Sequence, residues 1–295
     1  MSKPMQSQRK SNPASPVLFE AKTETQSRER PSLKPTVFWR IGEDIPRGLY
    51  WTLVTISIAV PFVAWWLLAN AGLVAPVFLP TPAEVWQSLV ELANDGLLSK
   101  DIQASFLRVA AGFLLAAVVS VPIGIAMGTF ASIRALFEPI IGIIRYMPAP
   151  AFIPLLILYL GIDETTKIAL IFIGTVFYNT LMIMDAVKFV PKELIETTYT
   201  LGGNRLQTLL QVITPHVVPN IIDTFRINVA ASWNLVIVAE LVAAEVGLGK
   251  RILLAQKFLH TEQIFAYLIV LGVIGFAIDL LFRWLLRTTC RWSFD

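Results

Sequence analysis

One apolar stretch in the C-terminal third of the chain carries polar side chains that are expensive to place in hydrocarbon. Arg226, Trp233 and Glu240 follow one another at seven-residue spacing, so on a helix they lie roughly on one face. Polar groups within a membrane tend to face the bundle interior or a pore. The spacing therefore predicts that this face lines a path for a polar solute. The structural alternative is that Arg226 pairs with Asp185 or Asp279.

A second polar group lies in a proline-rich stretch, RYMPAPAFIP. Prolines interrupt the helical hydrogen-bond ladder, and backbone groups freed at membrane depth must be satisfied by protein or by a water-filled cavity. An interrupted helix beside a solute path has such a cavity. We therefore place four consecutive residues on the path: Arg145, Tyr146, Met147 and Pro148. The alternative is that Arg145 reaches the lipid headgroups.

The sequence contains no group of residues whose types and spacing indicate covalent catalysis. There is no glycine loop ending in Gly-Lys-Ser/Thr, so we expect no ATP bound by the chain itself. His216 and His260 are far apart without a His-Glu-x-x-His helix, and Cys290 has no second cysteine. The sequence predicts no catalytic residue, no metal site and no cofactor in this chain.

Composition indicates a polytopic membrane protein. Hydrophobic residues make up 55% and charged residues 15% of the chain, and the mean hydropathy is +0.65. The expected fold class is all-α, with the lipid bilayer as solvent. A net charge of +3 is small, so nucleic acid is not an expected partner.

Apolar segments of the roughly 20 residues needed to cross a bilayer suggest about six spans. Residues 1–45 are polar and are predicted to be a disordered cytoplasmic tail, and residues 46–295 form the transmembrane domain. Lys and Arg are dense in the tail and at the C-terminal end, which places both termini in the cytoplasm. The spans are predicted at 51–69, 106–128, 136–160, 167–187, 219–244 and 264–286.

The second of these spans carries small residues at four-residue intervals, which form one smooth stripe on a helix. Such stripes let transmembrane helices approach closely. The expected role is packing within one subunit, and the alternative is a dimer or gate interface. The stripe consists of Gly112, Ala116, Ser120, Gly124 and Gly128.

Between the fourth and fifth spans lies a polar loop, residues 188–218, around which the chain is organised. Its pattern predicts a helix from Pro191, a glycine turn, and a second short helix from Arg205 to Thr214 that ends at Pro215. The turn is Gly202-Gly203-Asn204. Such a unit can lie at a membrane surface and present its turn to another protein.

The same loop resembles the cytoplasmic coupling loop of the membrane subunits of bacterial ABC importers. The family pattern is Glu-Ala-Ala, three residues, Gly, nine residues, Ile-x-Leu-Pro. Glu196, Gly202 and Pro215 match it in register, whereas Thr197, Thr198 and Thr214 replace two alanines and the leucine. Three further segments resemble the nitrate, sulfonate, taurine and bicarbonate branch: LPTPAEVWQSLVEL, RYMPAPAFIPLLILYLGI and VAELVAAEVGLGKRI.

The resemblance implies a permease subunit of an importer in the bacterial inner membrane, with the type I importer fold. Two copies would form the pathway as a homodimer, two separate ATPase subunits carrying ATP and Mg would dock beneath, and an external binding protein would deliver the cargo. The residues implied to couple to the ATPase are Glu196, Gly202, Gly203, Asn204, Arg205 and Pro215.

Four basic residues favour a small anion as cargo, because a permeating anion needs local positive charge to offset its desolvation. They are Arg145 and Arg226, together with Lys250 and Arg251 in a loop expected at the outer face. Sulfonate or taurine, nitrate and bicarbonate fit this description. A different class of function, a self-sufficient secondary transporter or channel, would need ion-coupling carboxylates deep in the spans. Asp185 and Glu240 are the candidates for that role.

Overall fold

The computed structural model describes residue 38 and residues 44–293, and in this part of the chain every regular element is a helix. The chain divides after Ala59 into two units, and all contacts discussed below lie within the second, Val60–Asp295. The predicted tail, 1–45, lies almost wholly outside the described residues. The longer elements are α1 (Arg47–Asn70), α2 (Pro82–Asn94), α3 (Leu97–Thr129), α4 (Ala131–Ile144), α5 (Ile153–Leu160), α6 (Glu164–Lys188), α7 (Lys192–Thr200), α9 (Thr214–Ala243), α10 (Leu248–Lys257) and α11 (Thr261–Thr289). The short ones are η2 (Ala149–Phe152), α8 (Arg205–Gln207), η3 (Thr208–Ile213) and η4 (Arg291–Ser293).

Five described helices are long and apolar enough to cross a membrane, namely α1, α3, α6, the continuous helix Arg205–Val242, and α11. The remaining expected span, 136–160, is a broken one, because α4 and the pair η2–α5 are bent by 84°. The helix stops at Ile144 and resumes at Ala149, with Pro148 in an extended conformation between them. The predicted all-α fold and its proline break are confirmed.

The stripe of small residues on α3 packs against α6 within the chain. A Cβ atom added at Gly112 would lie 2.7 Å from the Cβ of Ile171, and one at Gly124 would lie 2.8 Å from the Cβ of Ile183. One at Gly128 would lie closer still to the Cβ of Val187. Distances this short leave no room for a side chain, so the expected role in packing within one subunit is confirmed.

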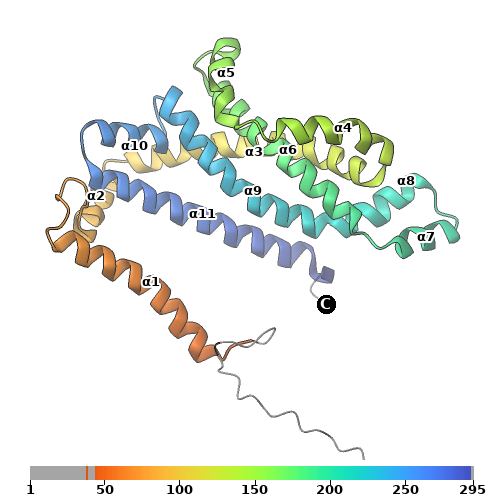
Figure 1. Cartoon of the computed structure of the whole chain (residues 1–295), viewed down its shortest axis with the longest axis horizontal. Coiled ribbons are helices and arrows are strands. Elements are labelled where there is room, and N and C mark those ends of the chain that lie inside the picture. Colours follow the sequence, from red (N-terminus) through yellow and green to blue (C-terminus); the bar gives the residue numbers. More distant parts are fainter. Residues whose placement is uncertain (1–37, 39–43, 294–295) are drawn as a thin grey trace, which may run out of the picture. The chain divides into compact units, whose positions relative to one another are not determined.

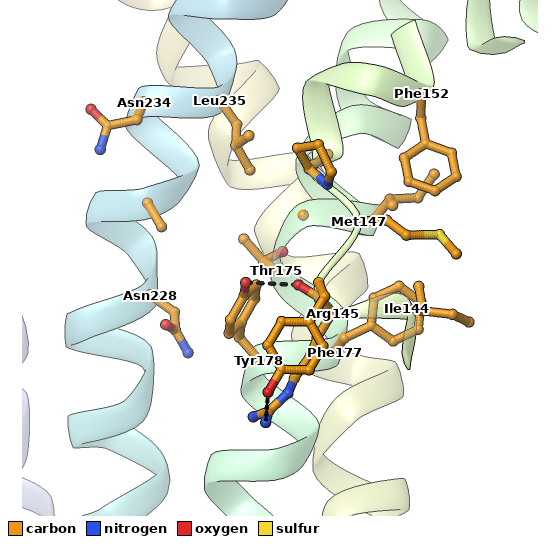
Figure 2. Close-up of a pocket in the computed structure, with 16 residues that line it drawn as sticks. Ile144, Arg145, Met147, Phe152, Thr175, Phe177, Tyr178, Asn228, Asn234 and Leu235 are labelled. Atoms are coloured by element: carbon orange, nitrogen blue, oxygen red, sulfur yellow. Dashed lines mark hydrogen bonds between the residues drawn. The ribbon is translucent and has the colours of Figure 1, made fainter. Parts of the chain in front are cut away.

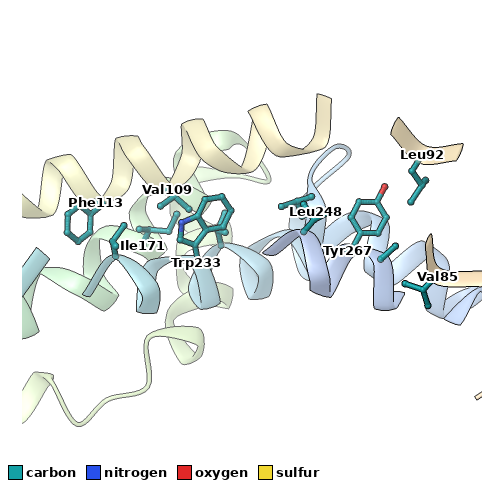
Figure 3. Packing of buried hydrophobic residues seen from close by; sticks show 12 residues of the cluster. Val85, Leu92, Val109, Phe113, Ile171, Trp233, Leu248 and Tyr267 are labelled. Atoms are coloured by element: carbon teal, nitrogen blue, oxygen red, sulfur yellow. The ribbon is translucent and has the colours of Figure 1, made fainter. Parts of the chain in front are cut away.

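A large apolar cluster joins α2, α3, α6, α9, α10 and α11 (Figure 3). Val109 and Phe113 of α3 meet Ile171 of α6 and Trp233 of α9. Tyr267 of α11 is 1% exposed and belongs to the same core. In Figure 1, α2 and α10 lie at one end of the long helices, and α7 and α8 lie at the other. The two ends of this unit therefore carry different structures.

The loop 188–218, called the coupling segment below, forms the expected helix, α7, and the expected glycine turn. Gly202 has φ +84°, a conformation that other residues rarely adopt. Asn204 caps the next helix, since its Oδ1 accepts from the Gln207 N–H at 2.9 Å.

The second short helix does not end at Pro215, as the sequence had suggested. It continues through the π-helix η3 directly into α9, so that α9 begins as the prolongation of the coupling segment. The wider π-turn leaves room for a proline ring, which cannot donate a backbone hydrogen bond. The hydroxyl of Thr214 donates to the Leu209 carbonyl (2.7 Å) at this point.

The α3–α6 contact leads to a prediction about stability. Gly124→Ala is expected to destabilise the fold by roughly 1–3 kcal/mol, because the new methyl group would overlap Ile183 and the Thr180 carbonyl. The matched control is Gly272→Ala in α11, where nothing lies within 4 Å and the helix gains the propensity of alanine. Thermal unfolding in detergent measures both, and equal unfolding temperatures for the two variants would contradict the proposed packing.

Candidate functional site

A cavity of about 630 Å³ opens where the broken span meets α6 and α9 (Figure 2). It is lined on one side by Arg145, Tyr146, Met147 and Pro148, which the sequence had placed on a solute path. On the other sides lie residues from two long helices: Thr175, Phe177 and Tyr178 of α6, and Asn228, Ala231 and Asn234 of α9. The cavity, called the α6–α9 cavity below, combines apolar walls with a few polar groups, as small-molecule sites commonly do.

Arg145 is held in this wall by two tyrosines. The hydroxyl of Tyr178 donates to the Arg145 carbonyl at 2.9 Å, which ties the broken span to α6. The guanidinium stacks over the Tyr146 ring at 4.8 Å, and its Nη2 donates to the Tyr146 hydroxyl at 2.9 Å. Its Nε is buried and has no partner among the described residues. A buried donor without an acceptor is costly, so a shift of the side chain that exposed Nε would let it donate to a solute in the cavity.

The predicted face of Arg226, Trp233 and Glu240 is not brought to this cavity. Trp233 and Glu240 are 7% and 0% exposed and point into the chain. Arg226 makes ion pairs with Asp279 (3.1 Å), one of the two partners in the structural alternative, and with Asp223 (2.8 Å), which the sequence analysis had not considered. Seven-residue spacing identifies a helix face, but it does not say whether that face turns inward to protein or outward to the path.

Glu240 instead belongs to a buried network at the end of the unit that carries α10. Arg108 of α3 lies between two carboxylates: its Nη1 donates to Glu240 (2.6 Å), and its Nε and Nη2 donate to the two oxygens of Glu164 (2.5 and 2.8 Å). Lys167 donates to Glu164 as well (2.8 Å). The Ser105 hydroxyl donates to Glu240 at 2.7 Å. We call this group, with Asp101 and Arg251, the Arg108 network.

The network fixes the start of α10 through its backbone. Three consecutive amides, those of Gly247, Leu248 and Gly249, donate to Asp101, Ser105 and Glu240 at 3.0, 3.0 and 2.8 Å. Acceptors and negative charge at a helix N-terminus are stabilising, so two buried carboxylates hold α10 in place. Arg251 also donates to Asp101 (2.8 Å), so this cation on the α10 side is already paired.

The coupling segment at the opposite end of the unit is exposed. Glu196, Gly202, Asn204, Arg205 and Pro215 all lie at the surface, and Gly203 is half-buried. Apolar side chains accompany them, since Leu201 is 83% and Leu206 is 63% exposed. An exposed apolar patch beside polar groups is typical of a surface that binds another protein.

The two carboxylates predicted as ion-coupling residues of a secondary transporter both form ion pairs. Glu240 is enclosed in the Arg108 network, and Asp185 pairs with Lys188 at 2.9 Å on the exposed surface of α6. Neither lines the α6–α9 cavity.

Sequence reasoning missed the Arg108 network on α3. A signal was present, because Asp101, Ser105 and Arg108 stand at i, i+4 and i+7, so they form a polar face on an otherwise apolar helix. It also missed Asn228 and Asn234, which line the cavity from α9.

Comparison with known proteins gives consistent matches. Residues 120–289 match the family described as binding-protein-dependent transport system inner membrane component. The taurine transport system permease protein TauC of Escherichia coli K12 is 34% identical over 247 residues, covering 81% of this chain and 90% of TauC. The putative aliphatic sulfonates transport permease protein SsuC of Bacillus subtilis is 32% identical (82% and 88% covered), and the nitrate import permease protein NrtB of Synechocystis is 28% identical (76% and 84% covered).

Solved structures agree in fold. A chain of the MetNI methionine ABC transporter, in an inward-facing conformation, superposes with a TM-score of 0.60 at 17% identity, covering 66% of this chain and 97% of the other. A chain of an amino acid ABC transporter gives a TM-score of 0.51 at 18% identity, with 68% and 97% covered.

Because Glu240 is fully buried, neutralising its charge is expected to lower the stability of the protein strongly. Glu240→Gln is expected to cost about 3–5 kcal/mol of stability, because it leaves the buried Arg108 short of one negative partner. Glu245→Gln is the control, since this glutamate is exposed five residues further along. Chemical denaturation of the two purified variants compares them, and a Glu240→Gln protein as stable as the control would show that the network does not hold this end together.

Proposed function

Since this chain belongs to the family of inner membrane components of binding-protein-dependent transport systems, we propose that it forms the membrane pathway of an ATP-driven importer for a small anion. ATP and Mg are bound by two separate ATPase subunits, which dock on the coupling segment. An external binding protein delivers cargo to the opposite face. Both termini of the permease lie in the cytoplasm of a bacterial cell, so that the coupling segment meets the ATPase there.

The observation that carries this proposal is the connection between the coupling segment and the cavity. The segment joins the end of α6 directly to the start of α9, and α6 and α9 are the two long helices that line the α6–α9 cavity. Displacement of the segment by a partner is therefore transmitted along rigid helices to the cavity walls. Closure of the ATPase pair on ATP turns the cavity from one side of the membrane to the other, and hydrolysis reverses the change.

The cavity is completed by a second copy of the chain. Ala231 and Asn234 are exposed in the single chain although they line the cavity, so the path needs another wall at this side. Asn234 lies exposed beside Ala230 and Ala231 in the interior of a membrane-spanning helix, where lipid contact is unfavourable for its amide. A homodimer provides this wall and gives the symmetric pathway that two ATPase subunits can drive.

The cargo is a small anion of the sulfonate or taurine, nitrate or bicarbonate class. Arg145 supplies the positive charge in the cavity, and its unpartnered Nε would donate to an oxyanion once a shift of the side chain exposes it. The relatives named for taurine, aliphatic sulfonates and nitrate support this class, since each name denotes a small anion or a zwitterion with an anionic group. The external binding protein selects among such anions.

A self-sufficient secondary transporter is the competing function. Its two candidate carboxylates, Glu240 and Asp185, are engaged in ion pairs away from the cavity, so neither is available there as a coupling site. Vesicles containing only this chain are expected to show no uptake of taurine or nitrate under an ion gradient. Addition of the ATPase and binding protein with internal ATP is expected to start uptake. Gradient-driven uptake by the chain alone would overturn the proposal.

Docking of the ATPase can be tested at one exposed leucine. Leu201→Asp is expected to weaken ATPase binding by about tenfold or more, because burying one leucine contributes about 1.5–3 kcal/mol. Leu73→Asp is the matched control, since Leu73 is 78% exposed and lies outside the coupling segment. Co-purification and titration of the ATPase with each variant give the affinities. Equal affinities would exclude Leu201 from the docking surface.

A further inference from the structure

A second polar pocket lies between α6 and α9, beyond the end of the α6–α9 cavity. It measures about 440 Å³, and its wall contains Arg108, Glu164, Lys167 and Glu245. Lys167 precedes Gly174 of the cavity by seven residues, and Val242 follows Leu235 by seven. Seven residues are two helical turns, on the order of 10 Å, so this Arg108 pocket and the cavity lie in line along the same pair of helices.

A buried apolar cluster lies between the two spaces. Ile153 of α5, Leu170 of α6 and Ala239 of α9 are buried together, with Leu156 and Val238 packed against them. They lie at the levels of α6 and α9 between the cavity and the Arg108 pocket. A solute moving along these helices would therefore meet a polar pocket, the buried apolar cluster and then the cavity.

The cations of the Arg108 pocket have an unusual arrangement. Arg108 and Lys167 are 5% and 4% exposed, yet both donate to a carboxylate whose side chain is 57% exposed. In an ion pair that only links two helices inside a protein, both side chains would be buried. Here the cations are built into the wall and the anion reaches them from the pocket side.

Arg108 does not depend on Glu164 for its orientation. Its Nη1 is fixed by the buried Glu240 (2.6 Å) and by the Val246 carbonyl (2.7 Å). The opposite edge, Nε and Nη2, is thereby presented to the pocket as a fork. Such a fork binds a planar or tetrahedral oxyanion through two parallel hydrogen bonds. Lys167 adds a third donor at 2.8 Å from the same carboxylate.

We propose that Arg108 and Lys167 form a transient binding site for the anionic group of the cargo, and that Glu164 is a tethered carboxylate that occupies this site until cargo displaces it. This inference rests on the proposed function and adds to it a site ahead of the buried apolar cluster. The charge balance is preserved in the exchange. Arg108 remains paired with Glu240, and the charge of Lys167 is matched by Glu164 before the exchange and by the cargo anion after it.

The tethered carboxylate has a physical use in transport. Without Glu164, Arg108 and Lys167 would share only Glu240, and the remaining buried positive charge would be costly and would hold a cargo anion too tightly for onward movement. A competing carboxylate on the same chain keeps the cations satisfied and makes release of the cargo favourable. Glu164 can move aside because it is the first residue of α6, and among the described residues its side chain is bound only by Arg108 and Lys167.

The test is anion binding to the purified full-length chain without its ATPase, with methanesulfonate as the probe in calorimetric titration. To remove binding at the α6–α9 cavity, all variants also carry Arg145→Gln. Glu164→Gln is expected to bind methanesulfonate about tenfold more tightly than the background, because the tethered competitor has lost its charge. Adding Lys167→Met to Glu164→Gln is expected to abolish this gain.

The matched controls are Asp163→Asn and Glu245→Gln, which neutralise carboxylates of the same pocket. The ion pairs of Arg108 and Lys167 in this pocket are made with Glu164 and not with these two residues, so the affinity should stay unchanged. Thermal unfolding verifies that each variant is folded. An unchanged affinity in folded Glu164→Gln, or a gain that survives Lys167→Met, would overturn the proposal. Glu164 would then have only a structural role, as the ion-pair partner that links α6 to α3. ATP-driven uptake by the unaltered importer would still stand in that case, so the two failures are distinguishable.

Discussion

The structure depends on one constraint: a polar group within a membrane-spanning bundle has to find its partner inside the protein. Arg108 shows the constraint most clearly, because this buried guanidinium is satisfied on one edge by Glu240 and on the other by Glu164. The same requirement explains the amides at the start of α10, which donate to Asp101, Ser105 and Glu240. It also explains why the broken span is found beside a cavity, where freed backbone groups can meet water or solute.

This constraint gives the two ends of the second unit different properties. At one end, the Arg108 network ties α3, α6, α9 and α10 together with charges and hydrogen bonds, while the glycine stripe joins α3 to α6 along their length. At the other end, α7 and α8 extend from α6 and α9 with exposed apolar side chains (Figure 1). A push on the exposed end can therefore tilt α6 and α9 about the fastened end, and this difference is the physical basis of the proposed coupling.

Much of this arrangement could be predicted from the sequence. Length and hydropathy located the spans to within a few residues at most of their ends, and the prolines around Pro148 located the break. The glycine turn at Gly202 followed from glycine's freedom at positive φ. The continuation of the coupling segment through Pro215 could not be foreseen, because a π-turn absorbs the proline and leaves no mark in the apolar pattern. The placement of Trp233 and Glu240 also escaped prediction, since a polar face on a helix looks the same whether it meets a pore or a buried partner such as Arg108.

The central claim is that nucleotide bound to a partner ATPase changes the side of the membrane from which the α6–α9 cavity is accessible. The most direct measurement places a single cysteine at Ala231, in a chain whose buried Cys290 is replaced by serine, and labels it in vesicles with a membrane-impermeant thiol reagent. We predict labelling from the cytoplasmic side without nucleotide and from the opposite side when ATP is trapped on the ATPase. Labelling that stays on one side regardless of nucleotide would contradict the account.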